Sequence, residues 1–283
     1  MKIRIIFKGS PQKRDALSWA AALGLALLSS LVFFLPPFAS AQAQAQAQAP
    51  TQSSPVQWGS YKFPSDALME YHISGQSHGI QYSAKAQIQW HVQGHVQGQG
   101  QGQRYSAKFE IQMPLFFGTR TQSSEGLLSD QGLKPLIFTD RHRKSQTVSI
   151  DQDKGVIKFA DNISTIPLEK LHQDALSVMF QLGSLLAGMN EPYPFNSAIK
   201  LPVLMSQSNE QWTLRLESKD NLKLPFGELA ALKIVRLPRS SSDHQKFTLW
   251  LSPTLGFLPV RLLIEEDNQD SVDQRLSAFR PLP

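Results

Sequence analysis

A strict alternation of apolar and polar side chains is the feature that most constrains what this chain can fold into. Between residues 80 and 92 every second position is apolar, with Tyr82, Ile88 and Trp90 among them, and residues 105–113 repeat the pattern. Successive side chains of a β-strand point to opposite faces, so a period of two indicates strands with one dry and one wet face. The Gln- and Gly-rich stretch between the two segments then predicts a hairpin loop.

Similar patterns recur along the chain, and we count about twelve strands. The further candidates lie at residues 68–74, 118–128, 134–141, 146–150, 155–160, 199–205, 212–216, 228–237, 247–251, 260–264 and 271–279. Short clusters of Gly, Asp, Asn and Ser separate many of them, as expected for turns.

One segment has helical spacing instead. Leu176, Met179 and Phe180 begin a stripe of apolar and small residues that recurs at intervals of three and four positions. Asp174 is a suitable N-cap and Gly188 a suitable stop. We therefore predict one main helix.

These elements predict a mainly β fold with a large, strongly curved antiparallel sheet. About twelve strands with one apolar face must bury that face, and one short helix cannot cover a flat sheet so wide. A barrel or half-barrel with the helix packed on or in it solves this problem, and a β-sandwich is the alternative. We assign residues 61–283 to a single β-rich domain.

The first 41 residues predict export. They carry five basic residues against Asp15, then an apolar run, then Ala39-Ser40-Ala41, the small residues that a signal peptidase reads. The alternative is an uncleaved inner-membrane anchor, since the run is long enough to span a bilayer. Residues 42–60, rich in Ala and Gln, predict a disordered tether. The predicted location is the periplasm.

Charge and composition exclude some functions. Without residues 1–41 the chain has 23 basic and 22 acidic residues. It therefore lacks the excess of positive charge that nucleic-acid binding requires. It has no cysteine and therefore no disulfide or thiol chemistry. After signal removal, no further apolar run reaches membrane-spanning length.

No group of residues in the sequence predicts catalysis, a metal or a cofactor. Residues 75–79 fit the pattern of a hydrolase nucleophile elbow, but a strand rather than a helix follows them, so we interpret them as a hairpin turn. His91 and His95 lie among glycines that oppose a helix. The acidic residues 265–267 lack the spacing of a calcium loop.

Two sets of residues are candidates for binding. If the sheet encloses a cavity, the expected lining residues are Trp90, Phe109, Leu176, Met179, Phe180 and Trp212. The densest basic run offers candidate anion contacts at Arg141, Arg143 and Lys144.

Several segments resemble a bacterial family called domain of unknown function 3108. The segments are Gly-Leu-Leu at 126–128, Gly-Leu-Lys-Pro at 132–135 with Phe138 and Arg141, Asp-Ala-Leu-Ser at 174–177, Trp-Leu-Ser-Pro at 250–253 and Leu-Pro-Val-Arg at 258–261. The resemblance implies an exported, β-rich envelope protein and supplies no catalytic residue. At the level of the fold, the predicted architecture is also similar to the periplasmic lipoprotein carriers, which hold acyl chains in a half-barrel under a helical lid.

The leading hypothesis is a non-enzymatic periplasmic protein that binds an apolar or amphipathic, lipid-like ligand inside the curved sheet. The first alternative is a structural or assembly protein of the cell envelope that acts through contacts with an unidentified protein partner. The second alternative is an enzyme, for which the sequence offers no candidate residues.

Overall fold

The computed structural model describes five stretches of the chain: residues 60–94, 102–112, 118–160, 165–189 and 191–283. The predicted signal peptide lies outside these stretches, as do the predicted tether except Ser60, and His95.

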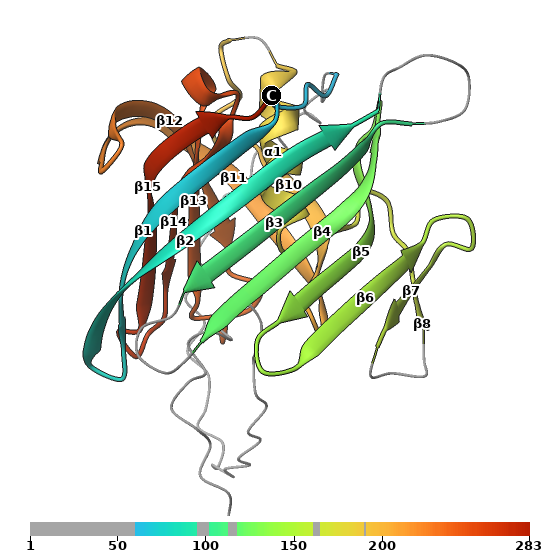
Figure 1. Ribbon diagram of the computed structural model, residues 1–283, viewed down its shortest axis with the longest axis horizontal. Coiled ribbons are helices and arrows are strands. Elements are labelled where there is room, and N and C mark those ends of the chain that lie inside the picture. Colours follow the sequence, from blue (N-terminus) through green and yellow to red (C-terminus); the bar gives the residue numbers. More distant parts are fainter. Residues whose placement is uncertain (1–59, 95–101, 113–117, 161–164, 190) are drawn as a thin grey trace, which may run out of the picture.

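Fifteen strands form one sheet, which Figure 1 shows as a strongly curved wall. The strands are β1 (Ala67–Ser77), β2 (Ile80–Gln93), β3 (Arg104–Gln112), β4 (Thr119–Ser129), β5 (Gly132–Arg141), β6 (Ser145–Asp151), β7 (Val156–Phe159), β8 (Thr165–Pro167), β9 (Gln173–Asp174), β10 (Ala198–Leu204), β11 (Asn209–Leu224), β12 (Gly227–Leu237), β13 (Lys246–Ser252), β14 (Leu258–Glu265) and β15 (Ser271–Pro281). Their order in the sheet is β8 to β1, then β15 to β9. All neighbours are antiparallel except β9 and β10, which are parallel.

The described residues contain one α-helix, α1 (Ser177–Ala187), and a short 3₁₀-helix, η2 (Pro253–Leu255). The predicted helix is confirmed, and it ends at the predicted Gly188. No helix within the described residues is long and apolar enough to cross a membrane.

The connection between β8 and β9 requires the sheet to curl. These two strands are the opposite ends of the sheet, yet only residues 168–172 separate them in the chain. Such a connection spans roughly 20 Å at most when fully extended. The two ends of a fifteen-stranded sheet can lie so close only if the sheet bends round on itself, and this bending gives the concave interior that holds α1.

The turn between β1 and β2 confirms the interpretation of residues 75–79 as a hairpin. His78 and Gly79 form a two-residue loop, and both have positive φ angles, 51° and 79°. This backbone geometry matches the right-handed twist of the flanking strands. The backbone N–H of His78 donates to Asp270 Oδ1 at 2.6 Å, which ties the turn to the neighbouring β14–β15 connection.

The side chains on the concave face of the sheet form the hydrophobic core. In β2, Ala84, Ala86, Ile88 and Trp90 are buried, whereas the intervening residues from Lys85 to Gln89 are exposed. In Figure 1, β1–β5 lie in front of α1. The helix also contacts β9 and β14, so apolar side chains from both halves of the chain converge on it.

The structure confirms the curved antiparallel sheet with one helix but corrects two details. The sheet has fifteen strands rather than about twelve, because β8 and β9 have only three and two residues and cannot show an alternating pattern. The alternative of a β-sandwich is wrong, since all fifteen strands belong to one hydrogen-bonded sheet.

Candidate functional site

The helix α1 is buried on all sides. Ten of its eleven residues are buried, including Gln181 and Ser184 as well as the apolar ones. A helix with one wet face would be expected on the surface of a sheet, so this burial shows that α1 fills the concave interior rather than covering its rim.

Asp174, at the end of β9, fixes the start of α1. Its Oδ1 accepts hydrogen bonds from the backbone N–H groups of Leu176 (2.9 Å) and Ser177 (2.8 Å). In return, the Ser177 hydroxyl accepts a bond from the backbone N–H of Asp174 at 2.8 Å. The carboxylate thus satisfies backbone donors at the start of the helix, where the helix dipole also favours negative charge.

The second carboxylate oxygen of Asp174 connects the start of the helix to strand β4. Ser124 on β4 donates to Asp174 Oδ2 at 2.6 Å, and the Tyr105 hydroxyl lies 3.0 Å from the Ser124 hydroxyl. Burial raises the pKa of Asp174 to about 6 despite these hydrogen bonds, and it raises the pKa of Tyr105 well above its usual value. Since all three side chains are enclosed, this group holds the helix in place and has no access to a substrate from solvent.

An aromatic stack lies beside this polar group. The ring centre of Trp90 lies 4.3 Å from that of Phe180 on α1 and 5.4 Å from that of Tyr105 on β3. The interplanar angle is 17° in both pairs. The Trp90 indole N–H donates to the Pro64 carbonyl at 3.1 Å. Trp90 therefore packs as a fully buried part of the core, with its one polar atom satisfied.

Two glutamines, one on α1 and one on the terminal strand β9, join these elements to β5 across the interior of the curved sheet. The backbone N–H of Leu133 on β5 donates to Gln181 Oε1 of α1 at 2.8 Å, and Gln173 Nε2 of β9 donates to the Leu133 carbonyl at 3.0 Å. This part of β5 has no β6 partner, because β6 pairs only with residues 137–141. The side chains thus replace a missing strand, and we call this contact the glutamine seam.

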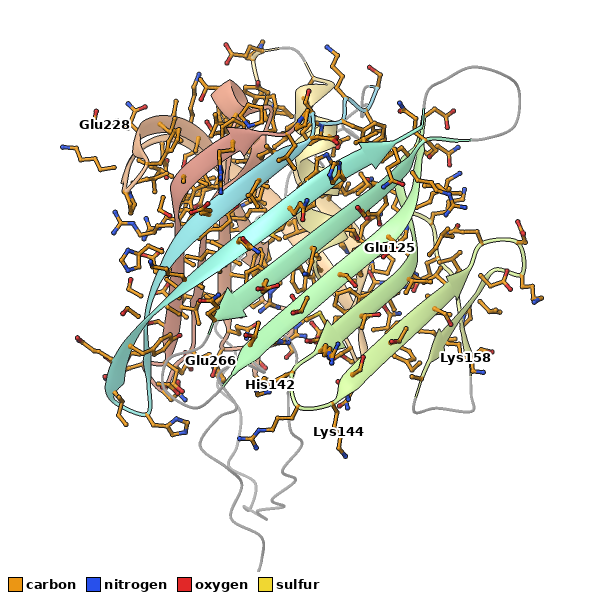
Figure 2. All side chains as sticks on the ribbon, viewed as in Figure 1. Glu125, His142, Lys144, Lys158, Glu228 and Glu266 are labelled. Carbon is orange, nitrogen blue, oxygen red and sulfur yellow. The ribbon has the colours of Figure 1, made fainter. Side chains whose placement is uncertain are left out.

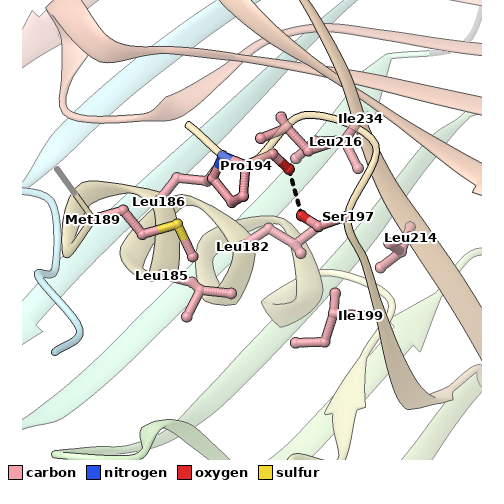
Figure 3. Close-up of a pocket in the computed structure, with 10 residues that line it drawn as sticks. All are labelled: Leu182, Leu185, Leu186, Met189, Pro194, Ser197, Ile199, Leu214, Leu216 and Ile234. Carbon is pink, nitrogen blue, oxygen red and sulfur yellow. Dashed lines mark hydrogen bonds between the residues drawn. The ribbon is translucent and has the colours of Figure 1, made fainter. Parts of the chain in front are cut away.

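A small apolar hollow lies between the second half of α1 and strands β10–β12. Its lining consists of Leu182, Leu185, Leu186, Met189, Pro194, Ser197, Ile199, Leu214, Leu216 and Ile234. Figure 3 shows the helix leucines on one side and the strand side chains on the other. The volume is about 20 Å³, which is room for about one water molecule, whereas pockets for small ligands measure roughly 300–1,000 Å³.

The connection between α1 and β10 contributes Pro194 and Ser197 to this hollow. The Ser197 hydroxyl donates to the Pro194 carbonyl at 2.5 Å. Residues 191–197 contain no strand or helix, and Phe195 among them is 40% exposed. An irregular segment therefore closes one side of the hollow.

The family model described as "Protein of unknown function (DUF3108)" matches residues 70–277. The chain belongs to this family. The match runs from β1 to β15 and therefore includes α1 and the hollow. No curated protein matches the chain.

The chain is similar to several solved structures. A β-barrel-like DUF1849 protein from Brucella abortus has a TM-score of 0.51 and 10% identity, covering 78% of this chain and 99% of its own. A putative lipoprotein from Parabacteroides distasonis has a TM-score of 0.33 and 10% identity, with coverage of 79% and 100%. A putative outer membrane lipoprotein-sorting protein domain from Vibrio parahaemolyticus has a TM-score of 0.23 and 8% identity, with coverage of 80% and 86%. The first of these shows that the DUF3108 protein has a β-barrel-like fold.

The residues expected to line a cavity lie in the core of the DUF3108 domain. Five of them are buried and one is half-buried: Trp90, Leu176, Met179, Phe180 and Trp212, and then Phe109. None of the six is among the ten residues that line the hollow. The hollow begins at Leu182, two residues after Phe180 on α1, and includes Leu214, the next inward residue after Trp212 on β11.

The candidate anion contacts of the DUF3108 protein lie on the turn between β5 and β6. Arg141, Arg143 and Lys144 are all exposed there. Figure 2 shows Lys144 and its neighbour His142 at the edge of the molecule. The three side chains are on one turn and face solvent, whereas the hollow lies beneath α1.

The other polar candidates are placed in turns and strands. His91 on β2 contacts the carboxylate of Asp66, and His244 contacts Asp267 at 2.7 Å. Within the described residues, no group of three or more His, Cys, Asp or Glu side chains could hold a metal ion.

Proposed function

We propose that this DUF3108 protein is a non-enzymatic protein of the bacterial cell envelope that binds an apolar or amphipathic, lipid-like ligand inside its curved sheet. The observation that carries the proposal is the apolar hollow beneath α1. Nine of its ten lining residues are apolar, and an irregular segment rather than a strand closes one side of it. The envelope location rests on the export signal predicted for residues 1–41.

Ligand binding requires the hollow to widen, because its present volume of about 20 Å³ holds no acyl chain. Residues 191–197 are the segment that could move outward. Among the described residues, the backbone bonds between this segment and β11 lie at one end of the segment: the Asn196 N–H donates to the Leu216 carbonyl (2.8 Å), and the Leu216 N–H donates to the Ser197 carbonyl (3.0 Å). The ion pair between Glu191 and Lys219 is exposed and therefore weak. Outward movement of this segment would open the hollow while α1 keeps its contacts with β5 and β9.

The test uses N-phenyl-1-naphthylamine, a neutral apolar probe that fluoresces when it leaves water. We expect saturable binding to the purified protein and its competition by a fatty acid. Leu186→Phe fills the hollow and should abolish binding, whereas Leu176→Phe places the same bulk at a buried position directly before α1, outside the lining, and should retain it. Absence of saturable binding, together with ligand-free protein in native mass spectrometry of periplasmic extracts, contradicts the proposal.

A groove on the outer face favours the second candidate function, a structural or assembly protein. It has a volume of about 400 Å³ and lies over strands β1–β3, with polar lining residues Glu70, His72, Lys85, Gln87, Glu110, Gln112 and Ser277. A photo-crosslinking residue at Gln87 would then trap one dominant envelope protein in cells. The same residue at Glu228, which is exposed at the β11–β12 turn, serves as the control (Figure 2).

A further inference from the structure

A buried ion pair lies at the end of strands β11 and β12. The Arg236 side chain is 1% exposed and that of Asp243 is 4% exposed. Arg236 Nη1 donates to Asp243 Oδ2 at 2.6 Å, and its Nη2 donates to the Gln245 carbonyl at 2.7 Å. The guanidinium group also lies 5.5 Å from the ring centre of Trp212. An arginine buried this deeply on the inner face of a sheet requires a compensating anion.

A second arginine converges on the same carboxylate. Arg239 donates from Nε to Asp243 Oδ2 at 2.9 Å and from Nη2 to Oδ1 at 3.1 Å, and it also pairs with Glu210 at 2.5 Å. Burial opposes ionisation of Asp243, but the hydrogen bonds from Arg239 and Arg236 lower its pKa below the ordinary value. The two guanidinium groups therefore form a fork that holds one carboxylate.

The carboxylate comes from an irregular segment rather than from the sheet. Asp243 lies between β12 and β13, in residues 238–245, which contain no strand or helix. Residues 240–242 in the same segment are exposed serines. Movement of residues 240–245 can therefore carry Asp243 away from Arg236, which remains fixed on β12, and from Arg239, which lies at the start of the segment next to β12.

The arginine fork adjoins the hollow. Arg236 is paired in register with Leu214, and Ile234 precedes it on the same face of β12; both of these residues line the hollow. Directly paired residues on one face have Cβ atoms about 5 Å apart. In addition, Arg236 Nε is buried and has no hydrogen-bond partner. On the inner face of β11 and β12, the apolar residues Leu214 and Ile234 thus lie directly beside the guanidinium-bearing side chain of Arg236.

We propose that the ligand is an anionic amphiphile, whose carboxylate or phosphate headgroup binds Arg236 and Arg239 in place of Asp243 and whose apolar chain passes between Leu214 and Ile234 into the hollow. Asp243 is then an internal substitute for the headgroup. This inference rests on the proposed function and adds the chemical class of the ligand. A neutral headgroup would leave buried Arg236 without a counter-charge when Asp243 moves away, so it would bind less tightly.

The experiment compares 11-(dansylamino)undecanoic acid with its methyl ester on the purified protein at pH 7.5. The acid should bind on the order of tenfold more tightly than the ester, because only the acid supplies a charged hydrogen-bond acceptor. Asp243→Asn should increase the affinity for the acid and leave that for the ester unchanged. Arg239→Gln should reduce the affinity for the acid, whereas Lys233→Gln, on the opposite face of β12, should have no effect. Equal affinities for acid and ester in the wild type and in Asp243→Asn overturn the inference.

Two further measurements keep the test independent of variant folding. In the wild type, the acid but not the ester should increase hydrogen exchange in residues 238–245, since it displaces Asp243; unchanged exchange at saturation overturns the inference. Dodecyl phosphate should displace the dansyl acid, whereas inorganic phosphate at the same concentration should not; displacement by inorganic phosphate overturns the assignment to an amphiphile. If N-phenyl-1-naphthylamine and the ester bind but the acid binds no better, the inference fails while the proposed function stands. If none of the probes binds, the proposed function fails.

Discussion

Asp174 is a buried carboxyl group whose role in this domain is structural. It accepts hydrogen bonds from two backbone N–H groups at the start of α1 and from the Ser124 hydroxyl. The sequence predicted Asp174 as the N-cap from its residue type and position. In the structure the N-cap position is Leu176, and Asp174 lies two residues earlier, where its carboxylate accepts from the Leu176 and Ser177 N–H groups. It could not show the link to Ser124, which lies 50 residues away in the chain and approaches only when the sheet curls.

The raised pKa of Asp174 predicts a pH-dependent stability. The pKa of Asp174 is near 3.9 in the unfolded chain and about 6 in the folded protein. Between pH 3.9 and pH 6 the folded state therefore binds more protons than the unfolded state. The free energy of unfolding should therefore fall by ~2 kcal/mol from pH 4 to pH 6.5, relative to Asp174→Asn. Urea unfolding at a series of pH values measures this difference. Asp153→Asn, in the exposed turn between β6 and β7, should keep the wild-type pH profile.

Gly183 tests whether packing or helix propensity dominates inside the sheet. A Cβ atom at this position would lie 2.5 Å from the backbone oxygen of Phe257. Propensity alone predicts that Gly183→Ala stabilises the helix by ~1 kcal/mol, whereas the clash should destabilise the protein by about 1–3 kcal/mol. Gly102→Ala, whose Cβ would lie 3.6 Å from the nearest atom, is the control and should be near neutral. A higher midpoint of thermal unfolding for Gly183→Ala contradicts this account.

At the scale of elements, the sequence left open whether the helix packs on the curved sheet or inside it. The stripe from Leu176 to Ala187 predicts one apolar face and does not by itself place the polar side chains of Gln181 and Ser184. In the structure both are buried: the glutamine seam supplies Gln181 Oε1 with a backbone N–H on β5, whereas the Ser184 hydroxyl has no hydrogen-bond partner among the described residues. Periodicity predicts which residues form a helix but does not reveal that a polar side chain completes the hydrogen bonds of a distant strand.

The glutamine seam predicts a local weakness when Gln181 is replaced. Gln181→Leu removes the acceptor for the Leu133 N–H and leaves that group buried without a partner. We expect a loss of about 1–3 kcal/mol in the free energy of unfolding, with faster hydrogen exchange at the Leu133 amide. The control is Gln211→Leu, because Gln211 is exposed and its amide reaches only Glu169 at the surface, 3.1 Å away. Unchanged exchange at Leu133 would show that the seam does not hold β5.

At the scale of the whole molecule, the architecture followed from two sequence observations. Long alternating segments required a wide sheet with one dry face, and the single helical segment required that sheet to curve. The size and position of the hollow could not be predicted from the sequence, because they depend on how individual side chains pack around α1. This is why the expected lining residues fill the core, while the hollow begins two residues after Phe180 on α1.

The enclosed position of α1 predicts a graded pattern of local opening. Backbone amides of α1 and of β13, both of which are almost wholly buried, should exchange most slowly. Those of β7 and β8, which are short and lie at one end of the sheet, should exchange first. Hydrogen exchange followed by peptide mass spectrometry measures both. Exchange of α1 as early as β8 would mean that the helix leaves the interior without global unfolding.

The pairing of the first strand with the last has a consequence for how the chain can be rearranged. Ala67 faces Pro281 across the β1–β15 ladder, and the backbone N–H of Leu282 donates to the Asp66 carbonyl at 2.9 Å. A short linker could therefore connect these two points, and new termini could be placed in a hairpin such as the β6–β7 turn, without breaking any ladder. A circularly permuted gene should thus encode the same sheet, and a fusion partner attached directly before Asp66 or directly after Leu282 would sit at the same corner of the molecule.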